Sequence, residues 1–66
     1  MRDEEKLLVL IPHWIEHNGE HAAEFRRWAA RAGIGEADLL KAAEAMERAN
    51  DHLRAALEKL KGPPKP

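Results

Sequence analysis

Two long segments of the chain place apolar side chains at helical spacing. In the first segment a stripe recurs every three or four residues, and in the second the spacing alternates regularly between four and three. The second pattern is the heptad repeat of helices that pack along a seam. The first stripe comprises Ile15, Asn18, Ala22, Phe25, Ala29 and Ala32, and the second comprises Leu39, Ala43, Met46, Asn50, Leu53, Leu57 and Leu60. The patterns predict two helices, over about residues 12–32 and 36–61.

Proline and glycine set the predicted ends of these helices. Pro12 suits the first position of a helix, where its missing N–H costs nothing. Gly33 and Gly62 suit the left-handed conformation that ends a helix. The connection over residues 33–35 is so short that the helices must form an antiparallel hairpin. Asn18-Gly19 is also a turn signal, but the stripe keeps its phase across it, so we expect one helix with an internal glycine.

The segment before the first helix is predicted to be an extended arm. Residues 7–11 are five consecutive apolar residues without helical periodicity. Ile11 precedes a proline, which disfavours the helical conformation. We therefore expect residues 1–11 to form an N-terminal arm that lies on the hairpin, with a short helix capped by Asp3 and broken at Pro12 as the alternative. The proline-rich residues 62–66 are expected to form a flexible tail.

Size limits how such a hairpin is stabilised. We expect the 66 residues to form one helical-hairpin domain, and a chain of about this length buries only about 60% of its unfolded surface. There is no cysteine for a disulfide. One partner helix cannot cover all the apolar side chains, so we expect a homodimer that forms an all-α four-helix bundle. The predicted core and interface residues are Trp14, Phe25, Trp28, Met46, Leu53 and Leu57.

Charge narrows the classes of partner. Eleven basic and twelve acidic side chains give a net charge of −1, which argues against nucleic acid or an anionic membrane as the main partner. The longest apolar run is too short to insert into a membrane or to form the core of a signal peptide. The sequence therefore predicts a soluble, cytoplasmic protein.

Three of the four histidines, His13, His17 and His21, lie in the first helix at intervals of four residues. On a helix this spacing places the imidazoles along one flank. All three span about 12 Å of helix, so one metal ion can bind only a neighbouring pair. The remaining ligands must come from a two-fold mate, a carboxylate or water. Nitrogen and oxygen donors without sulfur suit nickel, cobalt, zinc or copper(II).

Glutamates follow each of these histidines after three residues. Glu24 lies nearest the line between His17 and His21, so it is the best candidate for a carboxylate ligand or a group that orients an imidazole. Glu47 lies on a flank of the second helix, where it could reach a site in the bundle. The alternative is that the glutamates are solvated, that His21 packs at the core edge and that the other histidines face solvent.

Two asparagines occupy seam positions, one on each helix. A buried asparagine without a partner costs about 1–3 kcal/mol, so we expect Asn18 and Asn50 to be buried and hydrogen-bonded. They would then either specify register and oligomeric state in the dimer core, as in coiled coils, or contact a ligand.

The residues Pro-His-Trp-Ile-Glu-His-Asn at 12–18, Glu-His-Ala at 20–22 and Glu-Phe-Arg-Arg-Trp-Ala at 24–29 form a distinctive series, followed by Met-Glu-Arg-Ala-Asn at 46–50. This series resembles a family of small, His-rich prokaryotic helical domains associated with nickel and cobalt handling. The resemblance implies that His13, His17 and His21 bind metal and that a partner is a metal-handling protein. Gly19 departs from the bulkier polar residue of that pattern.

Three functions are consistent with these patterns. The first is a metal-binding bundle without catalytic turnover that serves transition-metal binding or delivery. The second is a structural or protein–protein interaction module in which the histidines are incidental. The third is a small metal-dependent enzyme of the hydrolase kind, with Glu24 as general base to a metal-bound water. We place it last because nothing in the sequence defines a substrate pocket.

Overall fold

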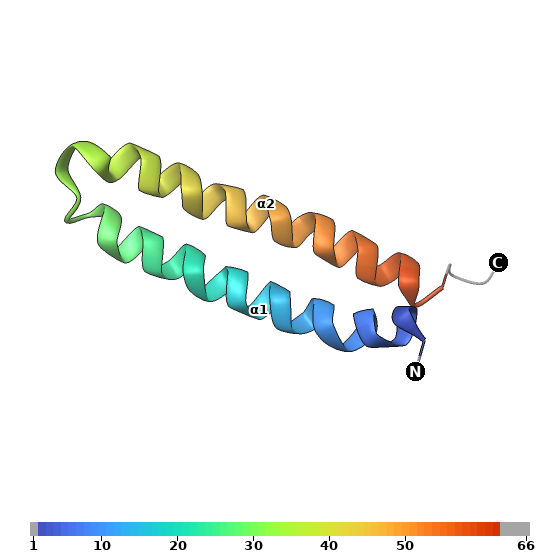
Figure 1. The fold of residues 1–66 in the computed structure, drawn as a ribbon. Coiled ribbons are helices and arrows are strands. Elements are labelled where there is room, and N and C mark those ends of the chain that lie inside the picture. Colours follow the sequence, from blue (N-terminus) through green and yellow to red (C-terminus); the bar gives the residue numbers. More distant parts are fainter. Residues whose placement is uncertain (1, 63–66) are drawn as a thin grey trace.

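The computed structural model describes residues 2–62, which form one antiparallel helical hairpin (Figure 1). Helix α1 covers Asp3–Ala29, a short 3-10 turn η1 covers Gly33–Gly35, and helix α2 covers Glu36–Leu60. The helices lie side by side, so the blue N-terminal end of α1 and the red C-terminal end of α2 lie at the same end of the hairpin (Figure 1). The all-helical hairpin expected from the two stripes is therefore confirmed.

The seam between α1 and α2 contains the residues of the two predicted stripes. The least exposed residues are Ile11, Ala22, Ala29, Ala43 and Asn50. The other stripe residues are half-buried, and they are Ile15, Asn18, Phe25, Ala32, Leu39, Met46, Leu53, Leu57 and Leu60. The apolar stripe of each helix therefore faces the other helix, as the spacing predicted.

The prediction of an extended arm over residues 7–11 is wrong, because α1 begins at Asp3 and continues through Pro12. A proline inside a helix costs about 3 kcal/mol, since it removes one hydrogen bond and its ring clashes with the carbonyl of Leu8. In return, Ile11 is only 3% exposed, and Leu7 and Leu8 are half-buried. Fully burying one such side chain stabilises the fold by about 1.5–3 kcal/mol. Packing of these residues therefore outweighs the proline.

The ends of α2 agree with the predictions, whereas the ends of α1 do not. Arg2, not Asp3, is the N-cap residue of α1, and its side chain makes no capping hydrogen bond. Helix α1 ends at Ala29, three residues before the expected end, and a turn leads to η1. Gly33 and Gly62 have positive φ of 57° and 101°, a conformation that glycine adopts readily. Only Gly62 directly follows the C-cap of a helix as predicted, because Gly33 is the first residue of η1.

The hairpin is a single layer of two helices, which leaves two broad faces open. Its principal extents are 50 × 27 × 12 Å and its radius of gyration is 15.4 Å, whereas a compact domain of this length has a radius of about 11 Å. Its accessible surface is 5354 Å², and a folded monomer of the same mass exposes about 4,200 Å². A single hairpin therefore leaves much more surface open to solvent than a globular protein of its size.

Candidate metal-binding and association face

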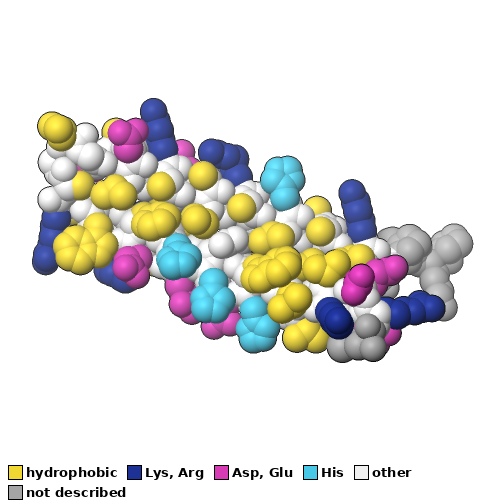
Figure 2. All heavy atoms as spheres, viewed as in Figure 1, with side chains coloured by type: hydrophobic (Ala, Val, Ile, Leu, Met, Phe, Trp, Pro, Cys, Tyr) yellow, Lys and Arg dark blue, Asp and Glu magenta, His cyan; other side chains and the backbone are white. Residues whose placement is uncertain are grey.

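The two open faces can be assigned from the rotation of each residue about its helix axis. Trp14, His21 and Trp28 lie about 50–90° around the α1 axis from the centre of its apolar stripe, all on the same side. We call the face of the hairpin on this side the aromatic face. In an antiparallel pair the same sense of rotation on α2 leads to the same face. The α2 residues at this rotation are the heptad-spaced alanines Ala42, Ala49 and Ala56. Figure 2 shows apolar side chains along this face, with histidines beside them.

Both tryptophans of the aromatic face remain exposed. Trp14 is 42% and Trp28 is 55% exposed. The guanidinium carbon of Arg31 lies 5.8 Å from the centre of the Trp28 ring, a cation–π geometry. An open depression of about 550 Å³ lies beside this ring, and its lining residues are Glu24, Arg27, Trp28 and Arg31. Both tryptophans, which the sequence predicts as core or interface residues, thus leave about half of their surface open to solvent.

The three predicted metal ligands of α1, His13, His17 and His21, are all exposed. His21 stacks on Phe25, with ring centres 6.1 Å apart and an angle of 17° between the rings. Among residues 2–62, no three histidine, aspartate or glutamate side chains of one chain come together as a metal site. One chain therefore offers at most a neighbouring pair, His13 with His17 or His17 with His21, and Glu24 is also exposed on the same helix.

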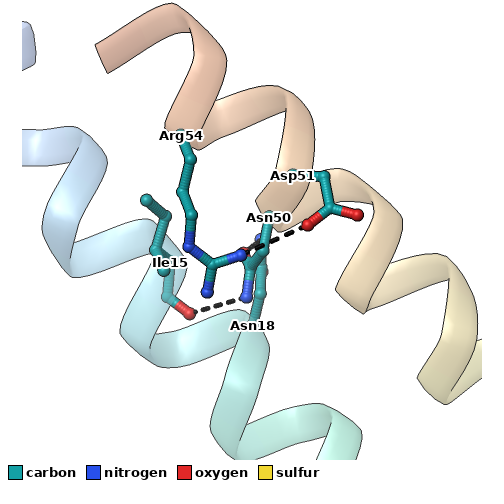
Figure 3. A network of polar contacts seen from close by, with 5 residues as sticks. All are labelled: Ile15, Asn18, Asn50, Asp51 and Arg54. Carbon is teal, nitrogen blue, oxygen red and sulfur yellow. Dashed lines mark hydrogen bonds and ion pairs between the residues drawn. The ribbon is translucent and has the colours of Figure 1, made fainter. Parts of the chain in front are cut away.

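The asparagine pair joins the two helices at mid-length (Figure 3). Asn18 Nδ2 donates to Asn50 Oδ1 at 3.1 Å, and Asn50 Nδ2 donates to the Ile15 carbonyl oxygen at 3.0 Å. Asn50 is 4% exposed and Asn18 is half-buried. The predicted hydrogen bonds are confirmed. Because the amides bond across the seam, they fix the axial position of α1 relative to α2.

Glu47 does not contact any predicted ligand. Its two carboxylate oxygens accept hydrogen bonds from the two terminal nitrogens of Arg26, each at 2.7 Å. The hydrogen bond from Arg26 lowers the pKa of Glu47, and the same bond raises the pKa of Arg26. Both residues lie about 70–90° from the seam centre on the side away from the tryptophans. We call this side the polar face. No sequence signal predicts the pairing of Arg26 with Glu47, because it depends on the axial position of one helix along the other.

The fold and the face define a class of protein: a two-helix, all-α domain with one open aromatic face that carries histidines. Residues 7–60 match the family described as "Domain of unknown function (DUF8180)", and the chain belongs to this family. No curated protein and no solved structure matches the chain significantly. Within residues 2–62, neither helix is both long enough and apolar enough to cross a membrane. The link to nickel and cobalt stays a prediction.

Proposed function

We propose that this chain is the protomer of a homodimeric helical bundle that binds a transition-metal ion through α1 and serves metal binding or delivery. The observation that carries the proposal is the position of His17 and His21. These two histidines are exposed, lie one helical turn apart, and share a face with two exposed tryptophans. The face therefore combines metal-binding side chains with a surface suited to association.

The dimer is supported by the area that one chain leaves open. The accessible surface exceeds that of a typical folded monomer of this mass by about 1,100 Å². A stable protein–protein interface buries about 800 Å² on each partner. Tryptophans such as Trp14 and Trp28 are the usual energetic anchors of such interfaces. A second copy packed on the aromatic face accounts for the excess surface without any other partner.

Metal binding is supported by the spacing of the histidines. Side chains four residues apart on a helix have Cβ atoms about 5–6 Å apart, which lets two imidazoles reach one ion. Glu24 is the nearest carboxylate candidate, and the partner chain or water completes the ligand set. Nitrogen and oxygen donors suit nickel, cobalt, zinc or copper(II).

Thermal unfolding with each of these ions tests the proposal. A metal ion that binds only the folded state stabilises it by about 2.7 kcal/mol when the ion's concentration is one hundred times its Kd. For a domain of this size, that stabilisation corresponds to a rise of about ten degrees or more in Tm. The rise should shrink strongly from pH 7.5 to pH 5, because a metal ion binds the neutral imidazole and protons compete with it for the ring nitrogens.

His17→Ala should abolish most of this rise, whereas the matched control His52→Ala, at an exposed position on α2, should preserve it. If no ion raises Tm at either pH, the metal-binding proposal is wrong.

The second candidate function is a protein–protein interaction module with incidental histidines. The exposure of Trp14 and Trp28 at 42% and 55% favours it, because the same surface can bind a different protein. Under this hypothesis the aromatic face remains essential for association, but metal ions change neither Tm nor the oligomeric state.

A further inference from the structure

A second heptad row runs along the aromatic face of α1 and into the turn that follows it. Each residue of this row directly precedes a seam residue of α1, so the row is rotated by about 100° from the seam. Its residues are Leu7, Leu10, Trp14, His17, His21, Glu24, Trp28 and Arg31. In a four-helix bundle each helix packs against two neighbours, along two such rows. The second row of α1 is therefore placed to pack against a helix that one hairpin does not contain.

The spacing of this row is symmetric about Gly19. An antiparallel copy of α1 that crosses at this level therefore brings row residues opposite row residues along the whole helix, as a two-fold axis requires. The resulting layers are Leu7 with the partner's Arg31, Leu10 with the partner's Trp28, Trp14 with the partner's Glu24, and His17 with the partner's His21. Leu10 and Trp28, which are 41% and 55% exposed in one chain, then cover each other. In the next layer the Glu24 carboxylate can accept a hydrogen bond from the indole N–H of the partner's Trp14.

Helix α2 gives the same centre independently. Asn18 and Asn50 lie at one level of the hairpin, because their side chains are hydrogen-bonded across the seam. The helices are antiparallel, so Gly19 lies level with Ala49. The row of α2 on the aromatic face comprises Asp38, Ala42, Ala45, Ala49, His52, Ala56 and Lys59, with Ala49 in the middle. A two-fold axis at this level is therefore central to the rows of both helices.

The α2 row suits close approach to its own copy about this axis. Alanine occupies four of its seven positions, and small side chains let helices approach closely. Ala42 lies level with the partner's Ala56. At the ends of the row, Asp38 lies within one residue of the level of the partner's Lys59, so opposite charges meet.

The histidines lie at the centre of the α1 row. His17 and His21 are each two positions, or about 3 Å, from the axis along the helix. Four imidazoles from the two chains therefore lie within about 6 Å along the helix direction. His13 is six positions, or about 9 Å, from the axis, too far to join them. Among residues 2–62 of one chain no three ligands come together, so such a site is complete only in the dimer.

The same centre is acidic. Glu20 and Glu24 of both chains lie within about 8 Å of the axis along the helix. Arg26 is paired with Glu47 on the polar face, and the next arginine, Arg27, is about 12 Å from the axis. With neutral imidazoles, this centre is negatively charged. The charge opposes the approach of two metal-free chains, and a divalent cation neutralises it.

We propose that two copies pair through these rows about a two-fold axis at Gly19, and that one divalent ion bound by His17 and His21 of both chains drives the pairing. This inference rests on the proposed function and adds the register of the dimer, the ligand set and the role of the ion in association. Four imidazole nitrogens suit a tetrahedral divalent ion, above all zinc, with cobalt(II) as its spectroscopic substitute.

Sedimentation equilibrium with and without zinc tests the role of the ion. If the ion binds the dimer and not the single chain, zinc at one hundred times its Kd strengthens self-association about a hundredfold by mass action. We expect this effect with one zinc ion per two chains. His17→Ala and His21→Ala should each abolish it, and both residues are exposed, so the hairpin stays folded. His13→Ala, at another exposed histidine of α1, is the matched control and should keep the effect.

A distance between spin labels tests the axis. The chain has no cysteine, and Ile34 between the helices is fully exposed at 106%, so Ile34→Cys adds one label outside both rows. With the axis at Gly19, each label is 15 positions from the axis, and the two labels lie about 45 Å apart along the helix direction. A shift of the axis by one heptad changes this distance by about 20 Å, and loops at the same end would give a short distance.

Three results would overturn the inference in different ways. Zinc that raises Tm with one ion per chain and leaves self-association unchanged would refute the shared site but keep the proposed metal binding. A dimer whose labels lie far from about 45 Å apart would refute the axis but keep the proposed dimer. A protein that sediments as a monomer with and without zinc would refute the proposed dimer itself.

Discussion

The aromatic face and the polar face are built from the same two helices, but they differ in how far the side chains of each face are paired within a single chain. On the polar face, Arg26 and Glu47 satisfy each other with two hydrogen bonds that connect α1 to α2. On the aromatic face, Trp14 and Trp28 remain about half exposed. The polar face therefore pairs its charged side chains within one chain, whereas the aromatic face supplies the exposed surface on which the proposed dimer depends.

Exposed apolar side chains outside the aromatic face do not form a comparable surface. Val9, Leu40 and Ile34 are also exposed, but Val9 points away from the seam, Leu40 lies on the side of the polar face, and Ile34 is in the loop. Singly exposed apolar residues are normal on soluble proteins. The contrast between the faces therefore rests on clustering, not on the number of exposed apolar residues.

Replacing both tryptophans should have the largest effect on this contrast. We expect Trp14→Ser with Trp28→Ser to weaken self-association by more than a hundredfold, because interface anchors of this type contribute about 2 kcal/mol or more each. Sedimentation equilibrium over micromolar concentrations measures the change.

Leu40→Ser is the matched control, since Leu40 is 39% exposed, close to the 42% of Trp14, but lies on the other face. If Leu40→Ser dissociates the protein as strongly as the tryptophan replacements do, the two faces are equivalent and the distinction fails.

Pro12→Ala should stabilise the chain without changing association, because Pro12 is exposed and lies on the side of the polar face. Removing a proline from a helix interior restores a hydrogen bond and relieves a clash, so we expect a gain of about 1–3 kcal/mol. That gain corresponds to about 4–8 °C in Tm per kcal/mol. A Tm equal to or below that of the wild type would mean that α1 does not continue through Pro12.

The same proline shows why the N-terminal segment was mispredicted. Local rules place a helix boundary at Ile11-Pro12, whereas burial is decided by contacts with α2 that no local window contains. In retrospect, Leu8 and Ile11 extend the stripe from Ile15 with the same spacing of three and four. When a partner helix is present, an apolar stripe that keeps its helical spacing across a proline therefore predicts the extent of the helix better than the proline does.

The candidate site was predictable in part. Spacing alone gave the histidine row and the two asparagines, because both depend only on rotation about one helix. The pairing of Glu47 with Arg26 was not predictable, because it depends on the axial position of α2 along α1. The Asn18–Asn50 hydrogen bond fixes that position, and it becomes visible only once both helices are in place.

Gly19→Ala should give a smaller stabilisation on the polar side of the molecule. A Cβ atom at Gly19 meets no other atom within 4 Å, and alanine is favoured over glycine in a helix interior by about 1 kcal/mol. We expect a Tm rise of about 4–8 °C with unchanged sedimentation. A fall in Tm would indicate that Asn18-Gly19 acts as a hinge in solution rather than as part of a continuous helix.

Glu47→Gln should have the smallest effect, and its pH dependence distinguishes the Arg26 ion pair from general charge effects. The hydrogen bond from Arg26 lowers the pKa of Glu47 in the folded state, so the stabilisation is present above the unfolded value of about 4.3 and is lost as pH falls through the lower folded value. The side chains of Arg26 and Glu47 are 43% and 52% exposed, so solvent screens the pair and the change in Tm should be small.

We expect Glu47→Gln to melt slightly below wild type at pH 7 and together with it at pH 2, while self-association stays unchanged at pH 7. Glu58→Gln removes an exposed carboxylate whose ion pair with Lys61, at 3.7 Å, lies at the C-terminal end of α2, so it controls for net charge without touching the contact between the helices. A difference between Glu47→Gln and wild type that persists at pH 2 would show that the ion pair does not hold the polar face together.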